Sequence, residues 1–199
     1  MIGVLFLLVL IIINGLVVMS EIALISAKRS RLEQSAARGD ENAKTALKLQ
    51  EKPEVFLSTA QIFITVIAIL EGVYSAERFT GYLTPTIEKI AFLKPYATTI
   101  ATVIIVIIVT FLSIIFGELL PKRIAMIKAE KLARASAKTM YFLSRVTLPI
   151  VWLLTRVTNL IFKIFNIKQS NDNKVTEEEI KAMVTEGSEH GAIEEEEKE

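Results

Sequence analysis

One stretch, from Ala97 to Arg123, limits what this chain can fold into more than any other part. Its first 20 residues, 97–116, carry no charge. At a rise of about 1.5 Å per residue, a helix of that length covers the roughly 30 Å hydrocarbon core of a bilayer. We therefore expect this stretch to cross a membrane as a helix.

The end of the stretch combines an acidic residue with a proline. Glu118 lies between Gly117 and Pro121, just before Lys122. Because proline has no N–H to donate, Pro121 is expected to release the Gly117 carbonyl beside the Glu118 carboxylate. Both oxygens are ligand types that Mg²⁺, Na⁺ and Ca²⁺ prefer. Alternatively, Glu118 pairs with Lys122 and Pro121 ends the helix. An ionisable group inside a span favours the metal site.

Composition places the chain among membrane proteins. Hydrophobic residues make up 52% of its 199 residues, in several long runs. The chain has no cysteine, and its single histidine, His190, lies in an acidic segment. These counts exclude thiolate chemistry and argue against a Ser-His-Asp hydrolase. We therefore expect no enzyme, and oxygen ligands as the main metal chemistry.

Three segments are expected to span the membrane, at about 2–26, 54–75 and 97–120. In the first, Asn14 and Glu21 share a face, and an interhelical hydrogen bond is the expected role of Asn14. The second carries no charge between Glu54 and Glu71. Small and polar residues recur along one of its faces, where most are expected to pack helices: Ser58, Gln61, Thr65, Ala68 and Gly72.

The loops between these segments differ in their Lys and Arg content. Residues 27–53 carry seven such cations around a break at Gly39, whereas residues 74–96 carry three. Because basic loops remain in the cytoplasm, we expect the N-terminus outside and the C-terminus in the cytoplasm, in a multi-pass cell-membrane protein. Residues 27–53 then form a solvated helical hairpin, Pro53 starts the next helix, and residues 74–96 form an outer loop.

Residues 146–167 are long enough for a fourth span. However, Arg145, Arg156 and Lys163 form one stripe opposite an apolar face that includes Trp152. A basic stripe against such a face is typical of a helix lying in the membrane interface. A fourth span would also carry the C-terminus outside, so the interfacial helix is favoured.

The last segment is acidic. Val175 and Thr176 precede Glu177 to Glu179, which resembles a capped helix start. The sequence predicts a transmembrane domain at 1–168 and an acidic cytosolic linker at 169–199, as in a fragment of a longer protein. A short acidic tail is the alternative.

Four segments carry a resemblance to a known family. They are NGLVVMSEIALISAKRSRLEQ from Asn14, FLSTAQIFITVIAILEGVYS from Phe56, IIFGELLPKRIA from Ile114 and VTEEEIKAMVTEGSEHGAIEEEE from Val175. With them the chain resembles the membrane domain of the CorC/CNNM family of magnesium and cobalt efflux proteins, also described as hemolysin C-like. The GELLPK segment and the acidic segment are the most specific.

The resemblance implies an all-α membrane protein, a homodimer of three-span subunits with a juxtamembrane helix. It also implies a magnesium site between the spans and sodium-coupled export. A cytosolic pair of CBS domains, expected just past Glu199, would bind ATP with magnesium, so ATP would bind only through domains that this chain lacks. The other expected partner is the lipid bilayer, and no nucleic acid is expected.

The resemblance also implies a set of magnesium ligands near the cytoplasmic ends of the spans. Many relatives carry a GNxxxN-like pattern in the second span, where this chain has Phe63, Ile64 and Ala68. Polar neighbours in the second span would have to supply the missing ligand oxygens. In the first span, Glu21 is a weaker candidate than Ser20, because the two side chains point about 100° apart. The predicted metal site therefore comprises Ser20, Gln61, Thr65, Gly117 and Glu118.

The leading functional prediction is a Mg²⁺ transporter that exports the ion from the cytoplasm with Na⁺ as the coupling ion. The alternative is a non-transporting membrane anchor or sensor that regulates magnesium homeostasis through cytosolic domains. Nothing in these residues supports a lytic activity.

Overall fold

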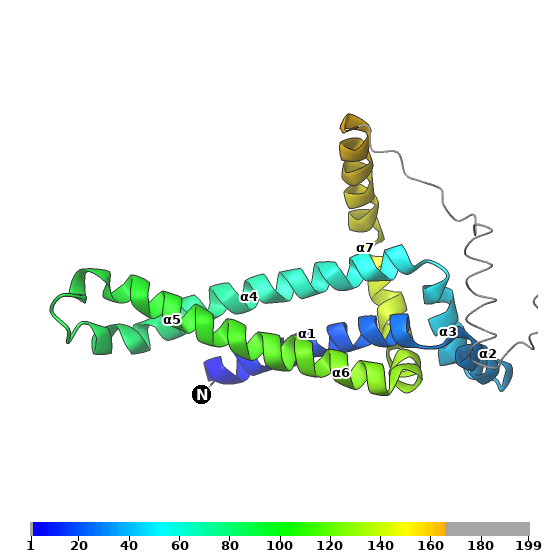
Figure 1. The fold of residues 1–199 in the computed structure, drawn as a ribbon, viewed down its shortest axis with the longest axis horizontal. Helices are drawn as coiled ribbons and strands as arrows, with labels where there is room; N and C mark the ends of the chain where they lie inside the picture. Colours follow the sequence, from blue (N-terminus) through cyan, green and yellow to red (C-terminus); the bar gives the residue numbers. More distant parts are fainter. Residues whose placement is uncertain (1, 166–199) are drawn as a thin grey trace, which may run out of the picture. The chain divides into compact units, whose positions relative to one another are not determined.

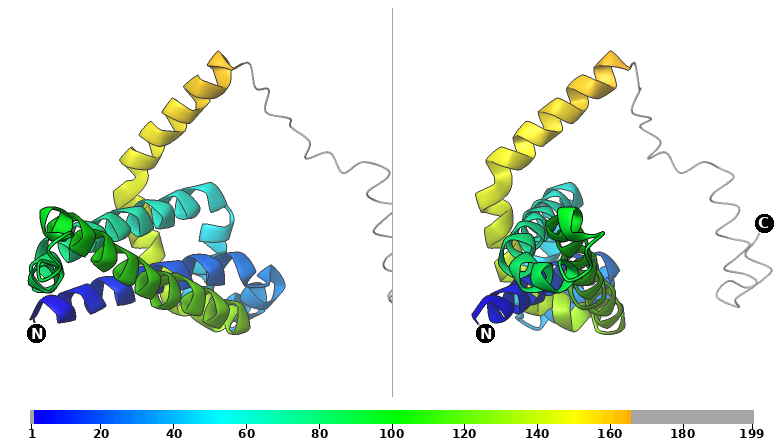
Figure 2. Two further views of the ribbon diagram at one scale, coloured as in Figure 1. Left: turned by 60° about the vertical axis from the view of Figure 1, so that its left-hand side comes forward. Right: turned by 90° about the vertical axis from the view of Figure 1, so that its left-hand side faces the viewer.

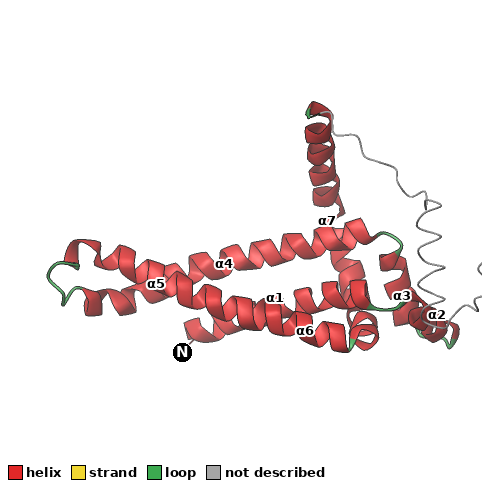
Figure 3. Cartoon of the chain, viewed as in Figure 1, coloured by secondary structure: helices red, strands yellow, loops and turns green. Residues whose placement is uncertain are grey.

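The computed structural model describes residues 2–165, which form helices joined by short connections, with no strand in this part of the chain (Figure 3). The residues divide into two units, with the boundary inside the last helix, between Leu154 and Thr155. The predicted acidic linker, 169–199, and the capped helix at Thr176 lie outside the described residues.

Three long helical rods run alongside one another in Figures 1 and 2. Helix α4 (Pro53–Ile87) packs against both α1 (Ile2–Ser26) and α5 (Ala97–Leu112). The third rod continues from α5 through the π-helix η2 (Ser113–Leu119) into α6 (Leu120–Ile127), and α1 packs against both of these.

Four helical stretches are long and apolar enough to cross a membrane, which makes this an all-α, multi-pass membrane protein. Three of them contain the predicted spans, at Ile2–Ser26, Pro53–Ile87 and Lys94–Ile127. The fourth is α7 (Ala129–Ile164), which also contains most of the predicted interfacial segment.

The second rod is longer than the sequence predicts. Helix α4 extends to Ile87 and includes Pro85, so the prediction of a loop over 74–96 is wrong. Packing against α5 explains the extension, because Ile87 is buried with Ala97 and Ala101. The hydroxyls of Thr80 and Thr102 also lie 3.2 Å apart, joining the two helices by a hydrogen bond. These contacts stabilise a helical hairpin, whose connection includes the short 3₁₀ helix η1 (Lys94–Tyr96).

At the other end of the bundle lie the short helices α2 (Arg29–Ala37) and α3 (Glu41–Gln50), as the predicted hairpin requires. Gly39 makes the turn with a φ of 94°, a conformation that favours glycine. The Asp40 carboxylate accepts the backbone N–H groups of Asn42 and Ala43 at 2.8 and 3.2 Å, which caps α3. Together with α6 and the start of α7, these helices form what we call the basic end.

Small side chains form much of the core at the basic end. Buried alanines from α1, α3, α4, α6 and α7 allow close helix contact there. Gln50 closes the end of α1, since its Nε2 donates to the carbonyls of Leu24 and Ala27 at 2.8 and 3.0 Å. Arg134 of α7 pairs with Asp40 at 2.9 Å, and Arg31 pairs with Glu130 at 3.2 Å.

Residues 146–164 do not form a separate helix. They belong to α7, a helix of 36 residues that also includes the basic segment after α6 and has Pro149 in its interior. Within the first unit, α7 is joined to α4 by a buried hydrogen bond of 2.8 Å between the hydroxyls of Thr59 and Thr147.

Candidate functional site

A polar cavity of about 160 Å³ lies where α1, α4 and the α5–η2 rod meet. We call it the interior cavity. Five of its lining residues are polar or acidic: Asn14, Glu71, Thr110, Ser113 and Glu118. Polar groups of this kind are uncommon inside apolar spans, where they mark ion paths or helix contacts.

The most deeply buried acid of this cavity is Glu71, which is only 3% exposed. The Ser113 hydroxyl, on the neighbouring rod, donates to its Oε2. Its other oxygen, Oε1, is buried and has no hydrogen-bond partner among the described residues. A buried carboxylate oxygen without a donor is costly, so this atom calls for a cationic or donor group that residues 2–165 do not supply.

A second unsatisfied acceptor comes from Asn14, at the midpoint of α1 and 6% exposed. Its Nδ2 donates to the Gly117 carbonyl at 3.4 Å, which confirms the interhelical role predicted for Asn14. The amide orientation follows from this contact, because the opposite orientation would set two oxygens against each other. Its Oδ1 is buried and, within residues 2–165, has no partner.

Two glycines bring α1 close enough for this contact. A Cβ on Gly117 would lie 3.0 Å from Asn14 Nδ2, and one on Gly15 would lie 3.0 Å from Cγ of Pro121. The π-helix adds to the effect, because its extra residue per turn displaces the backbone from regular helical geometry, as often occurs at functional sites. Pro121 does not end the rod: it lies in the first turn of α6, where a missing N–H is tolerated.

Glu118 has a different environment. Its Oε1 accepts from Lys122 Nζ at 2.6 Å, and about half of its side chain is exposed. This Glu118–Lys122 ion pair is the arrangement that the sequence predicts as the alternative to a metal site. Glu118 still lines the interior cavity, so this cavity has one carboxylate in an ion pair, Glu118, and one with no cationic partner among the described residues, Glu71.

The structure divides the predicted ligands between two places. Gln61 and Thr65 line a second cavity of about 570 Å³, together with Glu21 and Ser58. The Ser20 hydroxyl donates to the Leu16 carbonyl of its own helix at 2.7 Å. Glu118 instead lines the interior cavity. Gly117 is not part of that lining, but its carbonyl accepts from Asn14, which is.

Residues 2–165 contain no cluster of three or more His, Cys, Asp or Glu side chains suited to a metal ion. A cation in the interior cavity would therefore depend on carboxylate, amide and hydroxyl oxygens together.

Sequence analysis missed Glu71 and Ser113 as site residues. The available signal was the position of Glu71, which ends the charge-free run of the second span and continues its polar stripe. Ser113 gives no such signal, since a single serine in an apolar run is common in membrane helices.

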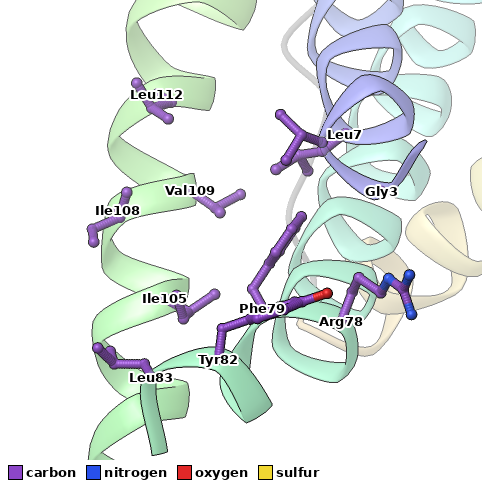
Figure 4. Close-up of a pocket in the computed structure, with 11 residues that line it drawn as sticks. Gly3, Leu7, Arg78, Phe79, Tyr82, Leu83, Ile105, Ile108, Val109 and Leu112 are labelled. Carbon is purple, nitrogen blue, oxygen red and sulfur yellow. The ribbon is translucent and has the colours of Figure 1, made fainter. Parts of the chain in front are cut away.

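Another cavity, of about 600 Å³, is lined mainly by apolar side chains (Figure 4). Leu7, Phe79, Ile105 and Val109 turn toward one another there, and Arg78 is the one charged residue of its lining. This surface offers few oxygen acceptors, so it is a poor place for a cation.

At the basic end, the acid that caps α3 has a perturbed pKa. The backbone N–H of Ala43, assisted by Arg134 and the N–H of Asn42, holds the pKa of Asp40 below its ordinary value. Asp40 therefore stays ionised as a helix cap and ion-pair partner, which is a structural role.

A buried acid inside a bundle of apolar helices is typical of one class, polytopic membrane proteins with an intramembrane polar site. The family described as the Cyclin M transmembrane N-terminal domain matches residues 5–197. The chain belongs to this family, which confirms the resemblance to CorC/CNNM proteins.

Named relatives include transport proteins. The chain is 40% identical over 194 residues to the UPF0053 protein sll0260 of Synechocystis sp., covering 98% of this chain and 43% of that protein. It is 33% identical to the polyamine export protein of Haemophilus influenzae, covering 92% and 42%, and 30% identical to that of Escherichia coli K12, covering 99% and 44%. The chain thus spans less than half the length of these relatives.

Proposed function

We propose that this chain is the membrane-spanning part of a cation exporter. The observation that carries the proposal is the interior cavity, where Glu71 and Glu118 from two different rods line one space inside the spans. Acids in that setting are expensive to bury and serve as cation-binding groups in transport proteins. The family supports a membrane transport role.

Mg²⁺ is the first proposed substrate, with Na⁺ as the coupling ion. Its ligands would be those predicted from the sequence: Ser20, Gln61, Thr65, Gly117 and Glu118. Binding would require the Glu118 carboxylate to leave Lys122, because the present ion pair occupies Oε1. Mg²⁺ demands near-octahedral oxygen geometry, so the helices carrying these groups would move together when the ion binds.

A polyamine is the second candidate, favoured by two relatives that are named polyamine export proteins. Polyamines are chains of ammonium groups, and each ammonium can donate to carboxylate and amide oxygens. The interior cavity supplies both acceptor types. The alternative to both exporters is an anchor or sensor, favoured by the Glu118–Lys122 pair.

The proposed arrangement has three spans, with the N-terminus outside and the C-terminus in the cytoplasm, in a homodimer. In this arrangement the later part of α7 lies in the membrane interface. The chain has no natural cysteine, so a single cysteine at Asn173 reports the topology cleanly. It should resist an impermeant thiol reagent added outside intact cells, as should a control at Ser35. Labelling at Asn173 alone would mean that α7 crosses the membrane.

Cation flux in proteoliposomes tests the function. Mg²⁺ and putrescine efflux should each be measured with and without an opposing Na⁺ gradient, against protein-free liposomes. Efflux of either cation above the protein-free rate supports the exporter and identifies its substrate. Efflux of neither, from protein shown to be folded, would favour the anchor or sensor.

A further inference from the structure

The strongest unexplained feature of the bundle is a pair of buried acceptors on one cavity. Glu71 and Asn14 are 3% and 6% exposed, and each has one oxygen without a hydrogen-bond partner among the described residues. They belong to α4 and α1, and both line the interior cavity. Two such acceptors on residues of one cavity wall are expensive unless a further group satisfies them.

The occupant must be a donor or a cation. Glu71 Oε2 already accepts from Ser113, and Asn14 Nδ2 already donates to Gly117. The two side-chain atoms that remain without a partner, Oε1 of Glu71 and Oδ1 of Asn14, are both hydrogen-bond acceptors. A proton on Glu71 Oε1 would satisfy Oδ1 of Asn14 as well only if the new hydroxyl donated directly to that oxygen, and it would leave the cavity itself empty. A cationic group between Oε1 of Glu71 and Oδ1 of Asn14 satisfies both at once.

Charge balance selects the class of cation. Among the residues that line the cavity, only Glu71 and Glu118 are ionisable, and Glu118 is already neutralised by Lys122 at 2.6 Å. The wall therefore presents one uncompensated negative charge. A divalent ion would leave a net positive charge in a low-dielectric setting, which is costly. A single positive charge leaves the site neutral.

Taken together, we propose that Glu71, Asn14 and Ser113 form a site for one singly charged cationic group, distinct from the predicted magnesium ligands. The group is either an alkali metal ion or one ammonium end of an organic amine, because both present a single charge to the same oxygens. The cavity, at about 160 Å³, exceeds the roughly 30 Å³ share of one water, so it can admit either. This proposal deepens the proposed function and rests on it for the role of the site.

Equilibrium binding tests the site apart from transport. The full chain, purified in detergent, is unfolded thermally in NaCl, KCl, putrescine dihydrochloride, MgCl₂ and choline chloride at equal ionic strength. Ligands that bind only the folded state raise the unfolding midpoint with concentration. We expect a saturable rise with an alkali chloride or with putrescine, relative to choline, whose quaternary nitrogen cannot donate.

Two variants localise the effect. Glu71→Gln keeps the shape of the side chain and removes its charge, so the rise should disappear. Glu54→Gln is the matched control, because Glu54 is an exposed acid on the same helix, and the rise should remain. An equal rise in Glu71→Gln, no rise with any monovalent cation or putrescine, or a rise with MgCl₂ alone would overturn the proposal.

A measurement on the parent protein covers the case in which Glu71→Gln does not fold. Dicyclohexylcarbodiimide modifies carboxyl groups in apolar surroundings, and peptide mass spectrometry can locate the adduct. Modification of Glu71 should fall severalfold when the protecting alkali ion or putrescine is present, and choline should not protect. Equal modification with and without them would contradict the site.

The cation that protects Glu71 distinguishes the two possible ligands. Protection by Na⁺ or K⁺ identifies a metal-ion site, and protection by putrescine alone identifies an amine site. Binding without flux would refute the exporter and keep the site, whereas flux without any cation-dependent stabilisation that Glu71→Gln removes would refute the site and keep the exporter.

Discussion

The two acids of the interior cavity have opposite surroundings. Glu118, toward the basic end, is half exposed and paired with Lys122, a residue of the next helical turn. Glu71 is buried, and its one hydrogen-bond partner comes from another rod, 42 residues away in sequence. A neutralised acid stabilises a helix boundary, whereas a buried acid with a free oxygen is prepared to bind a cation.

The contact between α1 and η2 joins two of the elements around the interior cavity, so breaking it should have the largest effect on stability. In Gly15→Ala, the new Cβ would lie 3.0 Å from Pro121 Cγ and 3.1 Å from the Phe116 carbonyl oxygen. We expect a loss of about 1–3 kcal/mol in the free energy of unfolding, since α1 must move away from η2. Reversible unfolding in mixed detergent micelles measures it.

Gly81→Ala is the control for this substitution, because no described atom lies within 4 Å of a Cβ at that position. It should be neutral or slightly stabilising, since alanine favours the helix. Equal losses in the two variants would mean that glycine flexibility, and not close approach at Gly15, explains the effect.

Removing the charge of Glu118, the paired acid, should weaken Mg²⁺ binding much more than it weakens dimer formation. Glu118→Gln removes a charge from the predicted oxygen site and preserves its shape, so we expect apparent Mg²⁺ affinity to fall on the order of tenfold. Dimer formation should change little. Thermal stabilisation by MgCl₂ and size-exclusion chromatography measure the two properties. If MgCl₂ stabilises parent and variant equally, Glu118 is only the boundary partner of Lys122.

The smallest effect on stability is expected at Asp40 in the basic end, which has a structural role and does not line the interior cavity. The pKa of Asp40 is lowered in the folded state, chiefly by the Ala43 N–H. Its contribution to stability is therefore present above the ordinary aspartate pKa of about 3.9 and is lost as pH falls toward the lower folded value. Asp40→Asn should weaken the acid dependence of the unfolding midpoint below about pH 4.

Arg134→Gln sharpens this prediction, because it removes one cause of the lowered pKa and leaves the Ala43 N–H in place. The acid dependence should then weaken only in part. A complete loss in Arg134→Gln would mean that the ion pair, rather than the helix cap, lowers the pKa of Asp40.

Features set by nearby residues were predictable from the sequence. The three predicted spans lie within long helices, the hairpin turns at Gly39, and α4 starts at Pro53. The Glu118–Lys122 pair was one of two stated alternatives, since it depends only on helical spacing. Apolar length and local turn chemistry determine all of these features.

Features that depend on packing between distant segments were not predictable. The extension of α4 through Pro85 depends on burial against α5, which overrides the local effect of proline. Continuity of α7 through Pro149 was missed as well. The interior cavity depends on Asn14 meeting Gly117, 103 residues away, and no periodicity in a single helix reports such a meeting.

The central claim is that the buried acid, Glu71, is required for cation export, and flux in proteoliposomes tests it most directly. Parent, Glu71→Gln and Glu54→Gln are reconstituted at equal density, and efflux of the cation that the parent transports is followed. The account predicts parent-like efflux in Glu54→Gln and efflux at the protein-free rate in folded Glu71→Gln. Efflux at the parent rate in Glu71→Gln would contradict it.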